Sequence, residues 1–282
     1  MLKTRIVTAL VLVPAVLAAL FLLPPFGWAL ATLAVVAIAS GEWSRLAGYS
    51  ATQGRLFTGA IVVTGAALLA WGWSADSGWR PGVVLVVCGI AAIFWLAVAP
   101  AWVLRRWSTR HVATQALVGL IVLLATWVAL VELQARSPWL VLAALAIVWI
   151  ADTAAYFTGR AFGRRKLAPL VSPGKSWEGV YGAWVAVVVY ALLLVPLAAA
   201  AGMRLPVNAG TVLAWLVLIF VIATASVVGD LFESLLKRQA GVKDSGTLLP
   251  GHGGVLDRID ALLAAMPLAA IAAQLFLDRS PA

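Results

Sequence analysis

Long apolar runs separated by short polar segments make up most of the chain. An α-helix needs roughly 20 mostly apolar residues to cross a membrane. The interiors of the runs are Leu, Val, Ala and Ile, and Trp is frequent near their ends, as in the aromatic belts at the two membrane surfaces. We therefore predict nine membrane-spanning helices, over residues 6–23, 28–46, 57–74, 82–103, 114–133, 138–158, 178–201, 210–228 and 259–277.

Composition supports this prediction and excludes several classes of protein. Of the 282 residues, 63% are hydrophobic and 11% are charged, and the mean hydropathy is +1.03. Soluble domains are about half apolar and about a quarter charged, so a soluble globular enzyme and a disordered protein are excluded. A single cysteine, Cys88, excludes a disulfide scaffold. The predicted fold class is an all-α, polytopic integral membrane protein.

The first apolar run follows Lys3 and Arg5, which is also how a cleaved signal peptide begins. The run is long for a signal peptide, however, and Pro24 and Pro25 stand where a cleavage site would contain small residues. We interpret it as a retained first span.

Basic residues divide unevenly between the two sides that nine spans would create. With a cytoplasmic N-terminus and an outer C-terminus, the cytoplasmic segments hold 16 of the 20 basic residues and the outer segments hold 4. Cytoplasmic loops of membrane proteins are enriched in Lys and Arg. This bias explains much of the net charge of +9 without a nucleic-acid partner.

Two connections are long and charged, at residues 159–177 and 229–258, and both fall on the predicted cytoplasmic side. Polar loops on a rigid scaffold are where chemistry is most often found. We therefore expect residues 1–134 to form N-terminal transmembrane helices, and residues 135–282 to form the catalytic transmembrane region.

Five of the eleven acidic residues lie between positions 230 and 260: Asp230, Glu233, Asp244, Asp257 and Asp260. On a helix, residues 230, 233 and 237 share one face, and Asp257 and Asp260 are three residues apart on another. Paired carboxylates suit Mg²⁺, which keeps several waters and shares its other positions with substrate phosphates. We predict that Asp230, Asp257 and Asp260 bind Mg²⁺, with Asp244 as a secondary ligand or an orienting residue.

A glycine-rich turn lies between these acids, at His252, Gly253 and Gly254. Glycines allow a close backbone approach, and successive backbone N–H groups can bind phosphate oxygens. Basic residues for a polyphosphate are Lys237, Arg238, Lys243 and Arg258. The alternative to a catalytic role is that these charges form salt bridges on a solvated loop. Acidic residues at the entrance to a membrane span are energetically costly, however, and are usually found there because they have a function. The pattern favours phosphoryl or nucleotidyl transfer.

The first loop supplies further candidates. Asp152 lies within a predicted span, where an acid is a functional candidate, although a bond to a neighbouring helix would also explain it. Arg160 and Arg164 could contact a lipid phosphate or a nucleotide, or could simply follow the basic bias of cytoplasmic loops. Lys175 is a candidate phosphate contact, and Ser176 is expected to cap the next helix, in a loop that lacks the spacing of a phosphate-binding P-loop.

Two other acids within apolar runs, Glu42 and Glu132, are interpreted as partners of Arg45 and Arg136. Neither is assigned a catalytic role.

Together these residues resemble the signature of the phosphatidate cytidylyltransferases, the CDP-diacylglycerol synthases. Over 27 residues the signature is matched without departure, by Ser234, Lys237-Arg238, Lys243-Asp244, Gly246, Leu249-Pro250, His252-Gly253-Gly254 and Asp257-Arg258-Ile259-Asp260. The segments around Asp152 and Lys175 are also similar to the family, with Gly174 where it usually has Lys. The resemblance covers the C-terminal half well, whereas roughly the first 130 residues match only as apolar spans.

The resemblance implies that CTP and phosphatidic acid react to give CDP-diacylglycerol and pyrophosphate, with Mg²⁺ and a second metal ion such as K⁺. It implies that Lys237, Arg238 and Lys243 bind the triphosphate and that Arg258 neutralises the leaving pyrophosphate. It also implies that His252, Gly253 and Gly254 shape the phosphate loop. Arg160, Arg164, Lys175 and Ser176 would contact either substrate. A homodimer in the bacterial inner membrane, with the site facing the cytoplasm, is expected.

Three alternatives are weighed against this reading. Another CTP-dependent lipid enzyme would use the same headgroup chemistry on a different acceptor. A secondary transporter would show inverted repeats and charges near the middle of the membrane, whereas here the charges gather at one side. A CDP-alcohol phosphotransferase would carry a differently spaced series of Asp residues, which we do not find in the sequence.

Overall fold

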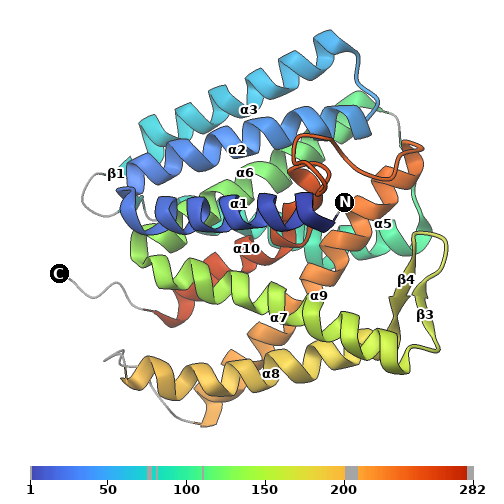
Figure 1. The fold of residues 1–282 in the computed structure, drawn as a ribbon. Helices are drawn as coiled ribbons and strands as arrows, with labels where there is room; N and C mark the ends of the chain where they lie inside the picture. The colour runs from blue at the N-terminus through green and yellow to red at the C-terminus, as the bar shows by residue number, and fades with distance from the viewer. Residues whose placement is uncertain (1, 75–77, 81, 110, 201–208, 278–282) are drawn as a thin grey trace.

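The computed structural model describes residues 2–74, 78–80, 82–109, 111–200 and 209–277 (Figure 1). The N-terminal part contains α1 (Leu2–Leu22), α2 (Pro25–Leu46), α3 (Ala51–Gly72), β1 (Trp73–Ser74), β2 (Gly78–Trp79), α4 (Val83–Ile93), the π-helix η1 (Phe94–Val98), α5 (Ala99–Arg105) and α6 (Val112–Arg136). The C-terminal part contains α7 (Pro138–Phe162), β3 (Lys166–Ala168), β4 (Ser172–Ser176), α8 (Trp177–Ala200), α9 (Ala209–Gln239) and α10 (Leu256–Phe276).

Most of the described residues lie in helical stretches long and apolar enough to cross a membrane. Within the described residues, eight helical stretches have the length and hydropathy of a span, with α4, η1 and α5 forming the single stretch Val83–Arg105. The apolar part of α1, Leu10–Leu22, is shorter. Each of the nine predicted segments thus corresponds to a helical stretch within the described residues. The prediction of an all-α polytopic membrane protein is confirmed.

Two parts of the predicted loops have regular structure instead. Helix α9 continues 11 residues beyond the predicted end at residue 228, to Gln239. Apolar side chains such as Leu231 and Leu235 are buried on this extension. The helix therefore keeps an apolar face beyond the end of the predicted span. In the first loop, β3 and β4 form an antiparallel hairpin in which Lys166 pairs with Ser176.

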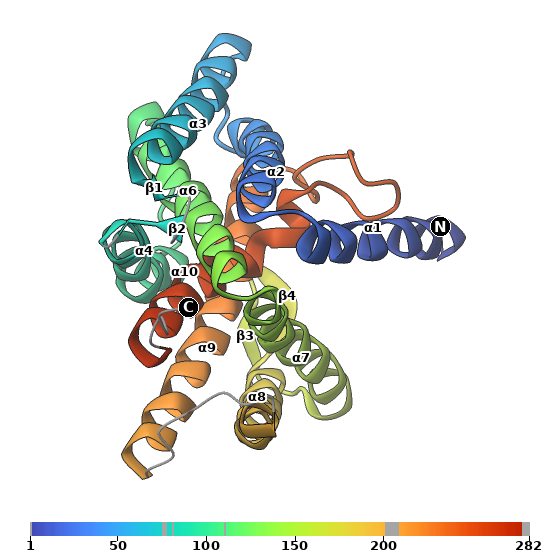
Figure 2. The same ribbon diagram turned by 90° about the vertical axis from the view of Figure 1, so that its left-hand side faces the viewer.

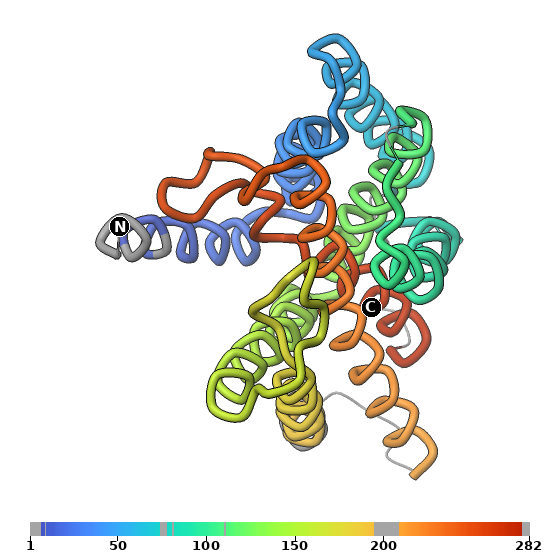
Figure 3. Tube along the Cα trace, turned by 90° about the vertical axis from the view of Figure 1, so that its right-hand side faces the viewer, coloured from blue at the N-terminus to red at the C-terminus, as the bar shows by residue number. Residues whose placement is uncertain are grey.

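The charged segments lie together at one end of the molecule. Figure 1 shows the N-terminus, the turn between α2 and α3, the β3–β4 hairpin and the 240–255 loop at its right-hand end, with the last helix leading to the opposite end. Viewed from that end, the hairpin and the 240–255 loop lie on either side of the end of α9 (Figure 3). These charged segments therefore lie at the same end of the bundle.

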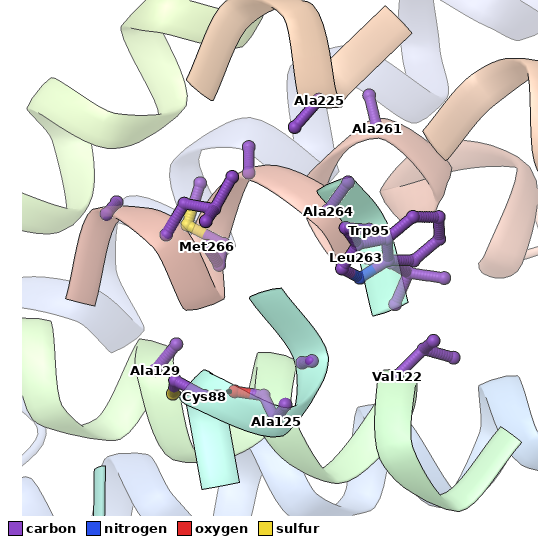
Figure 4. Packing of buried hydrophobic residues seen from close by; sticks show 14 of the residues in the cluster. Cys88, Trp95, Val122, Ala125, Ala129, Ala225, Ala261, Leu263, Ala264 and Met266 are labelled. Carbon is purple, nitrogen blue, oxygen red and sulfur yellow. Dashed lines mark hydrogen bonds between the residues drawn. The ribbon is translucent and has the colours of Figure 1, made fainter. Parts of the chain in front are cut away.

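Helix α10 lies at the centre of the bundle, among α4, α6 and α9 (Figure 2). Alanine is frequent on its buried surface, including Ala261, Ala264 and Ala265. Small residues let membrane helices approach closely. Figure 4 shows Ala261 near Ala225 of α9, and Cys88 of α4 beside Ala125 of α6, where the thiol lies 3.7 Å from the Ala125 carbonyl oxygen.

Aromatic side chains fix the C-terminal part of α9 against the N-terminal helices. Phe232 is buried, with its ring centroid 5.4 Å from that of Phe94, 5.6 Å from those of Trp95 and Trp102, and 6.4 Å from that of Trp43. Most of these rings meet edge to face, which is a favourable geometry for aromatic pairs. Because Phe232 is flanked by Leu231 and Glu233, this packing also fixes where the polar residues of α9 point.

Helices α9 and α10 pack closely at Gly229, where a Cβ atom would lie 2.6 Å from the backbone oxygen of Asp260. We expect Gly229→Ala to destabilise the protein by about 1–3 kcal/mol through overpacking, although Ala is the better helix former. Gly89→Ala is the matched control, because its Cβ would meet nothing within 4 Å. Thermal unfolding of both variants in detergent tests this, and equal melting temperatures would contradict it.

Candidate active site

Two lysines each bind carboxylates at the polar end of the bundle. Lys175 of β4 contacts Asp230 of α9, with Nζ 2.6 Å from Oδ2. Lys237 of α9 contacts Glu233 one turn earlier, and its Nζ also lies 2.8 Å from Oδ1 of Asp257 on α10. Ionised groups this close form strong, charge-assisted hydrogen bonds. These pairs join the hairpin, α9 and α10 into one site.

Asp257 is the most heavily bonded of these acids. Its Oδ2 accepts from the backbone N–H of Ser245 at 2.9 Å, from the Ser245 hydroxyl at 2.9 Å and from the backbone N–H of Gly254 at 2.8 Å. Its Oδ1 accepts from Lys237. The Asp257 carboxylate therefore fixes the position of the loop that precedes α10.

A second group of acids surrounds Lys175. The carboxylate of Asp230 is close enough to repel those of Asp152 on α7 and Asp260 on α10, and Lys175 attracts both. Asp230 also accepts a hydrogen bond of 3.2 Å from the Ser234 hydroxyl. Three acids from three helices thus share the positive charge of one lysine, an arrangement in which a further cation would be favourable.

Of the three predicted ligands, Asp230 is paired with Lys175 and Asp257 with Lys237. No group of three or more His, Cys, Asp or Glu side chains in the described part of the chain is arranged to hold a metal ion. Mg²⁺, however, is commonly held by one or two carboxylates together with substrate phosphates and waters. The hard oxygen donors of Asp230 and Asp260 fit that mode of binding.

The predicted phosphate loop is a tight turn. Gly251 and Gly253 have positive φ angles of 76° and 86°, which residues other than glycine rarely adopt. The Leu249 N–H donates to the Gly253 carbonyl at 2.9 Å. The Nδ1 atom of His252 is buried and has no hydrogen-bond partner in the structure.

The hairpin is attached to the ends of three helices. As predicted, Ser176 caps α8, accepting a hydrogen bond of 3.3 Å from the Gly179 N–H. Glu178 accepts from the backbone N–H of Arg165, and Arg238 of α9 donates to the Val171 carbonyl at 3.4 Å. Ser176 is buried, so its observed contact is structural, whereas Lys175 faces the acids.

The other predicted binding residues are exposed at the same end of the molecule. They are Arg160, Arg164, Arg238, Lys243, Asp244 and Arg258. Arg160 donates a hydrogen bond of 3.2 Å to the Tyr156 hydroxyl. Exposed cations around partly buried carboxylates are placed to meet an anionic substrate arriving from the aqueous side.

One residue of the site was not predicted. Glu42, at the end of α2, is buried and accepts hydrogen bonds from the Leu256 N–H at 2.7 Å and from the Ser245 hydroxyl at 3.1 Å. Its predicted pairing with Arg45 is present but long, at 3.8 Å. An acid inside an apolar run was the available signal. By contrast, Glu132 and Arg136 pair at 2.7 Å as predicted.

Comparison with known proteins agrees with this geometry. Residues 3–276 match the cytidylyltransferase family. Three bacterial proteins named phosphatidate cytidylyltransferase are similar along nearly their whole length. The one from Pseudomonas aeruginosa is 43% identical, with 95% of each chain covered. That from Haemophilus influenzae is 38% identical over 95% of this chain and 96% of its own, and that from Brucella suis is 36% identical over 98% and 95%.

The match extends across both halves of the chain, including the N-terminal helices whose sequence alone indicated only membrane spans. It also spans every element that contributes to the site, from Glu42 of α2 to Asp260 of α10. This chain therefore belongs to the cytidylyltransferase family, among the phosphatidate cytidylyltransferases.

Proposed function

We propose that the chain transfers CMP from CTP to phosphatidic acid and releases pyrophosphate, so that CDP-diacylglycerol is formed for phospholipid synthesis. The observation that carries the proposal is the pair of lysine–carboxylate contacts, Lys175 with Asp230 and Lys237 with Asp257. They place two cations and several acids at one end of a membrane-spanning bundle. Family membership and the names of the bacterial relatives support the same reaction.

The reaction needs charge neutralisation more than proton transfer. A phosphate oxygen of phosphatidic acid attacks the α-phosphorus of CTP, a new P–O bond forms, and the bond to the β-phosphate oxygen breaks as pyrophosphate leaves. The attacking oxygen is already anionic, so the main difficulty is to bring two anions together in line. Positioned cations and backbone N–H groups lower this barrier most when they act in a water-poor site.

The chain's own residues can be assigned to these tasks. Lys237 and the turn at His252, Gly253 and Gly254 lie beside the acids and are assigned to the triphosphate. The exposed Arg238, Lys243 and Arg258 attract CTP and stabilise the departing pyrophosphate. Asp257 holds Lys237 and the turn in place. The basic residues at the end of α7, Arg160 and Arg164, are assigned to the phosphate of the lipid, and the hairpin capped by Ser176 delivers Lys175.

We assign Mg²⁺ to Asp230 and Asp260, near Asp152, with the CTP phosphates completing its coordination. When bound, Mg²⁺ would neutralise charge on the triphosphate. Lys175 is assigned to a phosphate contact beside Asp230. Asp257 was predicted as a third ligand, and it is the carboxylate whose oxygens already accept four hydrogen bonds. A second ion such as K⁺ and a homodimer rest on the family resemblance.

We further propose that the protein lies in a bacterial inner membrane with this site facing the cytoplasm. The relatives are bacterial proteins, and the end that carries the site is also the end rich in basic segments. Positive segments of membrane proteins face the cytoplasm, which is where CTP is made.

The test is an assay of the detergent-purified chain with labelled CTP, phosphatidic acid and increasing Mg²⁺. We expect Mg²⁺-dependent release of pyrophosphate in step with formation of labelled CDP-diacylglycerol. A parallel reaction with a polyprenol or an ether-lipid phosphate identifies the acceptor. If CTP were consumed only with one of these lipids, the acceptor assignment would be wrong. If a folded protein never consumed CTP, the proposed reaction would be wrong.

A further inference from the structure

Glu42 is a buried carboxylate that the reaction described above does not use. It lies near the C-terminal end of α2, about 200 residues from the signature in the chain, and only 2% of its surface is exposed. Burying an ionised carboxylate is costly unless it is paired or hydrogen-bonded. Its closest cation, Arg45, is 3.8 Å away and largely exposed, so the charge is stabilised mainly by other groups.

The strongest of these groups is the beginning of α10. The Leu256 N–H donates to Glu42 Oε2 at 2.7 Å, and Leu256 is the first residue of the helix. The residue before it, Val255, has no side chain that can cap the helix. The first N–H groups of a helix lack partners within the helix, and the positive end of its dipole favours an anion. Glu42 therefore caps α10 from another helix.

The second contact links Glu42 directly to Asp257. The Ser245 hydroxyl lies 3.1 Å from Glu42 Oε2 and 2.9 Å from Asp257 Oδ2. A serine hydroxyl has a single proton to donate, so the two carboxylates compete for it. When the hydroxyl donates to Glu42, one Asp257 oxygen has a free lone pair. Glu42 and Asp257 are thus coupled through one hydroxyl proton.

The loop is shaped to admit the Glu42 carboxylate. A Cβ atom on Gly246 would collide with Glu42 Oε1, and a Cβ atom on Gly254 would collide with Oε2. Neither glycine has a positive φ angle, so backbone conformation does not explain why glycine is present. Arg45 adds a contact from the same helix, donating from Nη2 to the Ser245 carbonyl at 3.1 Å. Two signature glycines therefore make room for an acid from α2.

We propose that Glu42 is a positioning residue of the active site, which holds the first turn of α10 and the Ser245 segment so that Asp257 is correctly oriented. This inference rests on the proposed function for its kinetic consequences. Its structural part, the attachment of residues 245–257 to α2, can be tested without turnover.

The experiment compares Glu42→Gln with Glu132→Gln in the purified full-length chain. Both remove a buried carboxylate whose contacts reach α10. Those of Glu132 lie at the far end of the helix, where Gln274 donates to it at 3.4 Å and its partner Arg136 donates to the Leu277 carbonyl. We expect Glu42→Gln to lower kcat by about 10²-fold, the usual cost of a small misplacement of a reacting group. KM for CTP should change by less than about threefold, and the Mg²⁺ concentration for half-maximal rate should rise. Glu132→Gln should leave all three within about threefold of the parent values while lowering the melting temperature.

Hydrogen exchange provides the measurement that is independent of activity. In Glu42→Gln, exchange of the 245–257 amides should accelerate, and added Mg²⁺ should raise the melting temperature less than in the parent chain. Glu132→Gln should show neither change. Parent-like exchange and kcat in Glu42→Gln would overturn the proposal, as would kinetic losses equal to those of Glu132→Gln at equal melting temperature. If the parent chain did not turn over CTP, the proposed function would fail, and the exchange data would still decide whether Glu42 holds this segment.

A double-mutant cycle with Ser245→Ala tests the route through the hydroxyl. Because Ser245 connects the two carboxylates, the losses of kcat in Glu42→Gln and Ser245→Ala should not multiply in the double variant. Fully multiplicative losses would show that Glu42 does not act through Ser245.

Discussion

Replacing Asp257 with Asn is expected to lower kcat/KM by about 10³-fold while the protein still inserts into the membrane, because preorganised charge and hydrogen bonds account for losses of this size. The amide is nearly the same size as the carboxylate, so packing is retained. It removes the negative charge that faces Lys237, and its nitrogen cannot accept from the Ser245 and Gly254 N–H groups. Lys237 and the glycine turn then lose their fixed positions.

Initial rates at varied CTP, with thermal unfolding as a check on the fold, measure this effect. Asp244→Asn is the matched control, because it removes an exposed acid from the same loop. Its loss should stay below about tenfold, as is usual for exposed charges. A folded Asp257→Asn protein with more than a tenth of the parent activity would disprove the role given to this carboxylate.

Lys237→Met is expected to cause both loss of activity and loss of stability. The substitution leaves Glu233 and Asp257 facing each other without the ammonium group between them. Removing one partner of a buried ion pair costs about 3–5 kcal/mol of stability. Lys175→Met should cost less stability, because both members of the Lys175–Asp230 pair are more exposed to solvent.

A second substitution separates the two effects. In Lys237→Met/Glu233→Gln, one of the unpaired charges is gone, so much of the lost melting temperature should return. Turnover should stay low, because the lysine proposed to bind the triphosphate is still absent. Recovery of activity together with stability would show that Lys237 serves only to neutralise Glu233, and the triphosphate would have to be bound by other cations.

The helices could be predicted well from the sequence, and the candidate site residues could be named from it, because both depend on short-range patterns. A membrane span can be recognised from about 20 consecutive residues, and the signature from Ser234 to Asp260 is continuous in the chain. Asp257 and Lys237 were therefore identified before their contact was seen. Their pairing across two helices depends on how α9 packs on α10, which a local pattern does not specify.

The features that were not predicted depend on contacts between distant segments. Glu42 is joined to Leu256 and Ser245 only in the folded protein. The β3–β4 hairpin has no alternation of apolar and polar residues in Ser172–Ser176, and contacts such as the one from Arg238 to Val171 hold it. The three-acid metal set was inferred from helical spacing alone, which could not show that lysines are already bound to two of its members.

The central position of α10 has a consequence for biosynthesis. Chains are made from the N-terminus, and membrane helices insert before they associate. Helix α10 follows all the other described helices in the chain, yet α4, α6 and α9 pack around it. Until α10 is inserted, the surfaces of the earlier helices that pack against it are exposed to lipid. A ribosome that stalls before this helix leaves a membrane-inserted precursor without a catalytic centre, and cells gain no partly active enzyme from incomplete translation.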